Sequence, residues 1–166
     1  ENGKKLTDYN INDFIYHKPY ILNYTIKDDI LIYPDKLSKI DLEQFSLCDI
    51  LLIKTGYYKI RQTDKFKYET NNPGLSVEFT KLIRMNYPNI KCIGIDSLSI
   101  SSRKHRTIGR QAHKELLLQN NYKSNPLIIL EDIKFYDEIN NFVKIIISPL
   151  FIDNIDGIPC TVIAYY

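Results

Sequence analysis

Apolar residues recur three and four positions apart, the spacing of a helix face, in three stretches of the chain. These stretches predict helices over residues 7–16, 76–86 and 109–120. Thr7 or Asp8 can cap the first helix, and Ser76 can cap the second by accepting hydrogen bonds from its free backbone N–H groups. Pro88 ends the second helix, because a proline disfavours helical backbone in the residue before it.

Short apolar runs bounded by polar or turn-forming residues predict seven strands. They cover residues 20–26, 29–34, 49–56, 90–96, 127–131, 142–148 and 160–166. Lys27, Asp28 and Asp29 are expected to form the turn between the first two strands. The third run is mostly apolar and ends at Gly56, which indicates a strand buried on both faces.

Two long polar segments separate these elements. Residues 57–73 are rich in tyrosine and end in NNPG, and residues 97–108 are rich in serine and basic side chains. We interpret both as loops and as candidate walls of a binding pocket, since long loops in a compact domain are often functional. Shorter helical segments are expected over residues 42–45 and 132–141.

Strands and helices alternate through the middle of the chain, and this order predicts an α/β layered domain. The last two strands are joined by a connection containing Asp156 and Gly157, so we expect them to be antiparallel. The predicted fold is therefore an α/β domain with a mixed β-sheet and flanking helices. The chain has 166 residues, and this length predicts that residues 1–166 form a single domain.

Composition narrows the function without identifying it. The hydrophobic fraction of 44% and the charged fraction of 25% are typical of a soluble globular protein. The net charge of +2 is too small to favour nucleic acid or a membrane surface as a partner. No apolar run approaches the roughly 20 residues of a spanning helix. Cys48, Cys92 and Cys160 are isolated, which argues against a disulfide framework and favours a reduced, cytoplasmic setting.

His113 and Glu131 are the first candidates for chemistry. His113 precedes Leu116 and Leu117 by three and four positions, so it lies on or beside the apolar stripe of its helix. The pattern alone fits a partly buried, hydrogen-bonded histidine or a metal ligand. Glu131 closes the strand LIIL and can be a solvent-facing acid or a second ligand. Zinc normally takes at least three protein ligands, so the two residues make an incomplete site.

Other polar residues have equally open interpretations. Asp96 ends the strand IGID, where a carboxylate can lie over a cleft or hold a turn. His17 is most simply a surface residue, and Cys160 a small core residue rather than a nucleophile. The densest basic cluster can bind an anion or be a solvated loop, and it consists of Arg103, Lys104, His105, Arg106 and Arg110.

Six motifs in order resemble those of the cyclase family, the metal-dependent hydrolases that include bacterial kynurenine formamidase. They are DILLIKTGYY, NNPGLSVEFTKLI, IKCIGIDSLSI, AHKELLLQNN, IILEDI and DGIPCTVIAYY. The resemblance implies a swivelling β/β/α type of fold, homo-oligomers, and arylformamidase-like hydrolysis of a small-molecule amide at bound Zn or Mn. It implies that His113 and Glu131 are metal ligands and that Asp96 is structural or adjacent to the site.

The chain also departs from the family pattern. The main metal motif, HxGTHxDxPxH, does not occur in the sequence, and Thr161 stands where members often carry arginine. We expect the missing motif to precede Glu1 in a longer chain, of which residues 1–166 are the C-terminal portion. Two ligands cannot fix a hydrolytic metal, and no general base is visible beside them, so the catalytic residues stay unassigned.

Three hypotheses remain. The first is a metal-dependent amidohydrolase whose ligand set is completed outside this chain. The alternative is a non-catalytic binding or assembly module on the same scaffold, since only two ligands are retained. A third is binding of an anion or nucleic acid through residues 103–110, although aromatic side chains are not interleaved with these basic residues.

Overall fold

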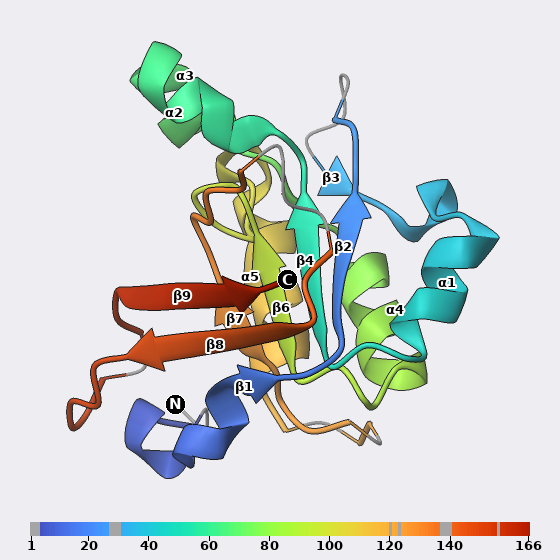
Figure 1. The fold of residues 1–166 in the computed structure, drawn as a ribbon. Coiled ribbons are helices and arrows are strands. Elements are labelled where there is room, and N and C mark those ends of the chain that lie inside the picture. Colours follow the sequence, from blue (N-terminus) through green and yellow to red (C-terminus); the bar gives the residue numbers. More distant parts are fainter. Residues whose placement is uncertain (1–3, 27–30, 120, 123, 137–140, 156) are drawn as a thin grey trace.

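The computed structural model describes most of the chain and arranges it in three layers (Figure 1). The described residues are 4–26, 31–119, 121–122, 124–136, 141–155 and 157–166. The middle layer is a parallel sheet in the order β2-β4-β6-β7. Its strands are β2 (Pro19–Asn23), β4 (Ile50–Lys54), β6 (Cys92–Ile95) and β7 (Ile128–Leu130).

The two outer layers cover opposite faces of the parallel sheet (Figure 1). The helical layer consists of α1 (Lys39–Phe45), α4 (Val77–Asn86) and α5 (Arg106–Leu117). The other layer is an antiparallel sheet in the order β1-β8-β9, with strands β1 (Ile15–Tyr16), β8 (Lys144–Pro149) and β9 (Cys160–Tyr165). The predicted α/β class with parallel and antiparallel strands is therefore confirmed, and the two kinds of strand form separate sheets.

Side chains of β4 alternate between the two cores, as the sequence predicted for a strand buried on both faces. Leu51 and Ile53 pack in the cluster shared with the helices. Ile50 and Leu52 pack in the cluster shared with the antiparallel sheet. All four are buried, so this strand links the two cores of the domain.

A short parallel pair places a second segment close to the helical layer. It consists of β3 (Leu31–Ile32) and β5 (Gly74–Leu75). Ser76 follows β5 directly and caps α4, because its hydroxyl accepts a hydrogen bond from the Phe79 backbone N–H at 3.1 Å. The predicted helix over residues 76–86 and its cap are confirmed.

The segment predicted as a loop over residues 57–73 is largely helical, and this prediction was wrong. It contains a 3-10 turn (Tyr57–Lys59) followed by α2 (Ile60–Thr63) and α3 (Lys65–Thr70). Asp64 starts α3 by accepting a hydrogen bond from the Lys67 backbone N–H at 2.9 Å. The two helices stand away from the sheets as an arm, which we call the α2–α3 arm (residues 57–70; Figure 1).

Two predicted helices were also wrong. Residues 7–16 form the 3-10 turns Leu6–Asp8 and Ile11–Phe14 and then β1. β1 pairs with β8, so long-range strand pairing overrides the local helical spacing. Residues 132–136 are irregular rather than helical, and residues 137–140 lie outside the described part of the chain. The turn predicted at residues 27–29 lies outside it too, as does Asp156.

The remaining predicted elements appear with shifted ends. The helix predicted over residues 109–120 begins earlier, as α5, and the helical turn over residues 42–45 belongs to α1. Within the described ranges, no helix combines the length and apolar character needed to cross a membrane. Cys48, Cys92 and Cys160 carry free thiols.

Candidate functional site

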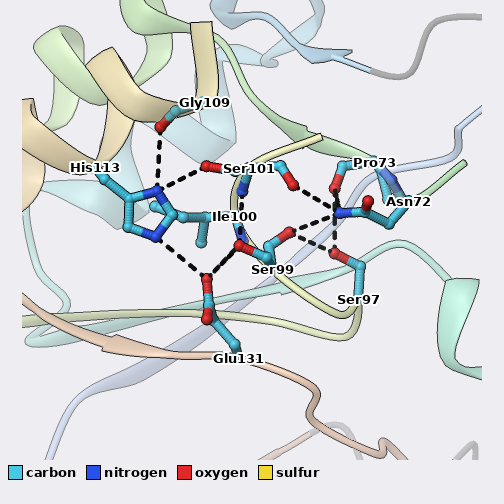
Figure 2. A network of polar contacts seen from close by, with 9 residues as sticks. All are labelled: Asn72, Pro73, Ser97, Ser99, Ile100, Ser101, Gly109, His113 and Glu131. Carbon is cyan, nitrogen blue, oxygen red and sulfur yellow. Dashed lines mark hydrogen bonds and ion pairs between the residues drawn. The ribbon is translucent and has the colours of Figure 1, made fainter. Parts of the chain in front are cut away.

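His113 and Glu131 meet where α5 passes the end of β7 (Figure 2). His113 lies on α5, and Glu131 directly follows the last residue of β7. The Nε2 atom of His113 and the Oε1 atom of Glu131 are 3.5 Å apart, and the two side chains are 31% and 33% exposed. Both line a cavity of about 370 Å³. The fold therefore brings together the two residues that the sequence singled out.

The other ring nitrogen of His113 is tethered to the interior (Figure 2). Nδ1 lies 3.1 Å from the Gly109 carbonyl oxygen and 2.7 Å from the Ser101 hydroxyl. A carbonyl can only accept, so the Gly109 contact is a hydrogen bond when Nδ1 carries a proton, whereas the Ser101 hydroxyl can either accept from that proton or donate to an unprotonated Nδ1. In the neutral tautomer with its proton on Nδ1, the lone pair is on Nε2, the nitrogen that faces Glu131.

Glu131 is held by the segment that follows β6. Its Oε1 atom accepts hydrogen bonds from the Ser99 hydroxyl at 2.8 Å and from the Ile100 backbone N–H at 2.9 Å. The Ser99 hydroxyl oxygen in turn accepts a hydrogen bond from the Ser101 backbone N–H at 3.1 Å. One short loop thus contacts both the carboxylate and the imidazole.

These contacts shift the pKa values of His113 and Glu131 in the directions that favour an ion pair. Burial disfavours the charged form of His113, but hydrogen bonding to Glu131, the Gly109 bond and the charge of Glu131 outweigh it, and the pKa of His113 is raised. Burial likewise opposes ionisation of Glu131, but hydrogen bonds from His113, Ile100 and Ser99 outweigh it, and the pKa of Glu131 is lowered. A lone pair on Nε2 that faces a carboxylate oxygen favours a cation between them, either a proton or a metal ion.

These pKa directions predict how the pair affects stability in the metal-free chain. The folded pKa of Glu131 lies below its ordinary 4.5, so its contribution is present above that pH and is lost as the pH falls. The folded pKa of His113 lies above its ordinary 6.5, so its contribution is present below that pH and is lost as the pH rises. The pair should therefore stabilise the fold most between about pH 4.5 and 6.5.

Urea unfolding at several pH values checks this expectation. A cycle of His113→Gln, Glu131→Gln and the double variant should give a coupling free energy of about 1 kcal/mol inside the window, as expected for a partly exposed pair. The coupling should shrink towards pH 3, about 1.5 units below the window, and towards pH 9, about 2.5 units above it. A coupling that does not change with pH would contradict the ion pair.

The loop of residues 97–102 is fixed in turn by a buried asparagine (Figure 2). Asn72 is completely buried, and its Nδ2 atom donates to the carbonyl oxygens of Ser99 at 3.3 Å and Ser101 at 2.8 Å. Its Oδ1 atom accepts from the Arg103 backbone N–H at 3.1 Å. Asn72 therefore sets the position of the hydroxyl and amide groups that face His113 and Glu131.

Two glycines allow the same loop to approach its neighbours. A Cβ atom on Gly109 would lie 2.5 Å from the Ser101 hydroxyl oxygen, so only glycine lets this serine rest on α5 beside His113. A Cβ atom on Gly74 would lie 2.2 Å from the Ser102 backbone nitrogen. The loop of residues 97–102, which we call the serine loop, therefore lies against both α5 and β5. Its contacts leave no room for a side chain at positions 74 and 109.

Asp96 holds a turn beside this loop. Its buried carboxylate accepts hydrogen bonds from the Thr55 backbone N–H at 2.9 Å, from the Thr55 hydroxyl, and from the Gly56 backbone N–H at 2.7 Å. Burial raises the pKa of Asp96, and the bonds from Thr55 and Gly56 offset part of that rise. Gly56 has a φ of 79°, and here the α2–α3 arm leaves β4. Of the two roles considered for Asp96, this arrangement is that of a turn-holding acid.

Apolar side chains form most of the cavity wall around the pair. They come from the N-terminal segment, β7 and the β8–β9 region, and include Leu6, Tyr9, Phe14, Leu127, Ile129, Ile147, Pro149 and Ile158. Residues 57–73 and 97–108, which the sequence suggested as walls, do not line this cavity. Cys160 does line it, and burial raises the pKa of its thiol, which disfavours the reactive thiolate.

The other sequence candidates lie outside this arrangement. His17 is exposed. Arg103, Lys104, His105, Arg106 and Arg110 are exposed on and before the first turns of α5. His113 and Glu131 are thus the sequence candidates that the fold joins, with Asp96 nearby in the chain segment that supports them.

The pair fits part of a metal site. Two ligands of a tetrahedral zinc ion at about 2.1 Å lie about 3.4 Å apart, close to the observed 3.5 Å between Nε2 and Oε1. The bond from Nδ1 to a backbone carbonyl is the usual support of a metal-binding histidine. Among the residues with described coordinates, however, no three His, Cys, Asp or Glu side chains gather closely enough to hold a metal. The ligand assignment of His113 and Glu131 therefore stays a prediction.

A comparison with protein-family models finds a match to this chain. The model is described as "Putative cyclase", and it matches residues 2–102 of the 166. The matched part contains Asn72, Gly74, Asp96 and the serine loop, and it ends before His113 and Glu131. A search of curated protein sequences finds no match.

Solved structures share the fold at low sequence identity. Isatin hydrolase A from Labrenzia aggregata, solved with benzyl benzoate, is 17% identical with a TM-score of 0.72, and the match covers 96% of this chain and 64% of that one. A potential metal-dependent hydrolase with cyclase activity is also 17% identical, with a TM-score of 0.63 and coverage of 98% and 70%. The chain therefore spans about two thirds of the length of these structures.

Proposed function

Because this chain belongs to the cyclase family, we propose that it is part of a metal-dependent hydrolase that cleaves an amide or formamide bond in a small molecule. The observation that supports this most directly is the arrangement of His113. Its Nδ1 atom is bound to the Gly109 carbonyl, and its Nε2 atom faces Glu131 on a cavity wall. A neutral imidazole nitrogen beside a carboxylate oxygen is a donor pair that Zn and Mn accept.

Solved structures of the same fold support the reaction class. One is named an isatin hydrolase, and another is described as a potential metal-dependent hydrolase. The preference for a formamide-like substrate comes from the resemblance of the six motifs. A cavity of about 370 Å³ with mainly apolar walls is of a size that suits a small molecule with an apolar body.

Within this proposal, a Zn or Mn ion held by His113 and Glu131 would act as a Lewis acid and lower the pKa of a water molecule towards about 7. The chain's own residues hold and orient the ligands. Ser99 and Ile100 fix one oxygen of Glu131, and Gly109 keeps the proton of His113 on Nδ1. The apolar cavity walls exclude bulk water and receive the apolar part of the substrate.

One observation favours a second candidate function. A catalytic zinc takes three protein ligands, whereas the described residues bring two, His113 and Glu131, close enough to share one metal ion. A family member that retained the cavity but lost hydrolysis would be a binding or assembly module. Purified protein without stoichiometric metal, even after incubation with Zn or Mn, would favour that function.

Metal-dependent turnover tests the proposal. The whole protein that contains this chain should hydrolyse an N-formyl aromatic amine or a cyclic amide when loaded with Zn or Mn, and chelation should remove the activity until metal is restored. Chromatographic detection of the released acid gives the rate. His105→Ala is the matched control, because this exposed histidine lies just before α5 and outside the cavity. Turnover that survives chelation would contradict a metal-dependent mechanism.

Two further expectations remain predictions. These are the cytoplasmic setting and the homo-oligomer. Exposed apolar side chains near the C-terminal strand support the homo-oligomer, and they include Leu150, Phe151, Ile163 and Tyr165.

A further inference from the structure

The α2–α3 arm is joined to the body of the domain by a polar contact beside Glu131. Tyr57 and Tyr68 stack on its inner side, with ring centroids 5.5 Å apart and an interplanar angle of 22°. Both rings are buried, and the Tyr57 hydroxyl donates to the Lys67 carbonyl oxygen at 2.7 Å, within the arm. The Tyr68 hydroxyl instead leaves the arm and donates to Oδ1 of Asp132.

Asp132 is held through both carboxylate oxygens. Oδ1 accepts from Tyr68, and Oδ2 lies 2.8 Å from Nη1 of Arg61 on α2. A cavity of about 430 Å³ is lined by Arg61 and its neighbours on the arm and by residues 132–134 on the body. The arm and this segment are therefore not densely packed together at this cavity, where the contacts of Tyr68 and Arg61 with Asp132 connect them.

The contact between Tyr68 and Asp132 affects Glu131 through the backbone conformation of Asp132. Asp132 has a φ of 60°, a left-handed conformation that glycine adopts freely and other residues adopt at a cost. Its N–H donates to the Ser97 carbonyl oxygen at 2.8 Å, and the Ile133 N–H donates to the Ile95 carbonyl oxygen at 3.2 Å. The left-handed residue thus sets the direction in which the chain leaves Glu131.

We propose that Tyr68, assisted by Arg61, is a positioning residue for Glu131. By holding the Asp132 carboxylate, it fixes the left-handed turn and keeps the Glu131 carboxylate against Ile100 and His113. Its relevance to hydrolysis rests on the proposed function, whereas the positioning itself does not. An aspartate at this position serves the contact with the arm, since glycine would satisfy the backbone alone.

Amide hydrogen exchange measured by NMR tests the positioning directly. The Ile100 N–H donates to Glu131, so its exchange reports whether the carboxylate stays in place. In Tyr68→Phe, this amide should exchange about tenfold faster, the factor that corresponds to one net hydrogen bond. The Leu127 N–H, which donates to the Leu116 carbonyl oxygen, should keep its rate. An Ile100 rate within about twofold of the unmodified protein would overturn the proposal.

Two further variants separate positioning from a purely structural role. Tyr57→Phe removes the tyrosine hydrogen bond to the Lys67 carbonyl oxygen within the arm, so it should speed exchange of arm amides and leave Ile100 unchanged. Asp132→Gly keeps the left-handed backbone without strain but removes the contact, so it should match Tyr68→Phe at Ile100. Full protection of Ile100 in Asp132→Gly would show that the backbone conformation alone suffices, and it would overturn the role of Tyr68.

Activity provides a separate readout. In the metal-loaded enzyme, Tyr68→Phe should lower kcat about tenfold with little change in KM, because a displaced Glu131 affects the reacting centre rather than the cavity walls. If the protein does not hydrolyse amides, the exchange result still decides the positioning. Failure of the proposed function is thereby distinguished from failure of this inference.

Discussion

Gly74→Ala is expected to lower the free energy of unfolding by about 3 kcal/mol, the upper part of the usual range for an added methyl group without room. The new Cβ would lie 2.2 Å from the Ser102 backbone nitrogen and 2.7 Å from the Ile100 carbonyl oxygen. Both atoms belong to the backbone, so no side-chain rotation relieves the overlap. β5 cannot move away cheaply either, because the Leu75 N–H donates to the same Ile100 carbonyl oxygen at 2.7 Å.

Urea unfolding of Gly74→Ala and Gly157→Ala checks this expectation. Nothing lies within 4 Å of a Cβ atom built on Gly157, so the control should change the unfolding free energy by less than about 0.5 kcal/mol. The Gly74 variant should also speed exchange of the Ile100 amide, because the serine loop is pushed away from Glu131. Equal stability of the two variants would show that the loop can move away without loss.

The sequence predicted elements whose signal lies within their own residues. α4 is an example, because Ser76 caps its first turn and Pro88 follows its end. β4 is another, because a short apolar run bounded by Gly56 has few alternatives to a strand buried on both faces. In both cases the sequence pattern and the element that it predicts lie within the same ten or so residues.

Predictions failed where distant residues decided the local structure. Ile11 and Phe14 have helical spacing, yet Ile15 pairs with Ile146 and Tyr16 with Ile145 on β8. A strand partner about 130 residues away leaves no trace in a local pattern. The α2–α3 arm failed for a different reason, because α2 and α3 are short and polar and lack an apolar stripe.

The candidate site also combines features that the sequence predicted with features that depend on distant residues. The inward direction of His113 followed from the apolar stripe of its helix, and its pairing with Glu131 followed from the order of motifs rather than from spacing. Asn72, Gly74 and Ser99 were missed. The roles of Asn72 and Gly74 depend on backbone atoms of other segments, and their signal in the sequence was the turn-forming run NNPG. Ser99 lies in the motif IKCIGIDSLSI, which did not indicate its contact with Glu131.

Glu131→Gln is expected to weaken binding of Zn or Mn by at least about 100-fold, beyond the 10- to 100-fold that loss of a supporting contact costs. Glutamine keeps the shape of the side chain but lacks the negative charge. Its carbonyl oxygen can still accept from Ser99 or Ile100. The loss should therefore come from the missing charge and ligand, with the fold retained. Competition titration with a chromogenic chelator measures the affinity.

Two companion variants make the assignment of Glu131 specific. Glu78→Gln removes the same charge from an exposed position in the first turn of α4, so metal binding should be unchanged. Ser99→Ala removes one donor to Glu131 and leaves the ligand, so the loss should be intermediate, about tenfold. A graded series of Glu131→Gln, Ser99→Ala and Glu78→Gln requires a metal that contacts the carboxylate directly. If Glu131→Gln and Glu78→Gln bound metal equally well, Glu131 would instead be a partner of His113 that holds a proton between them.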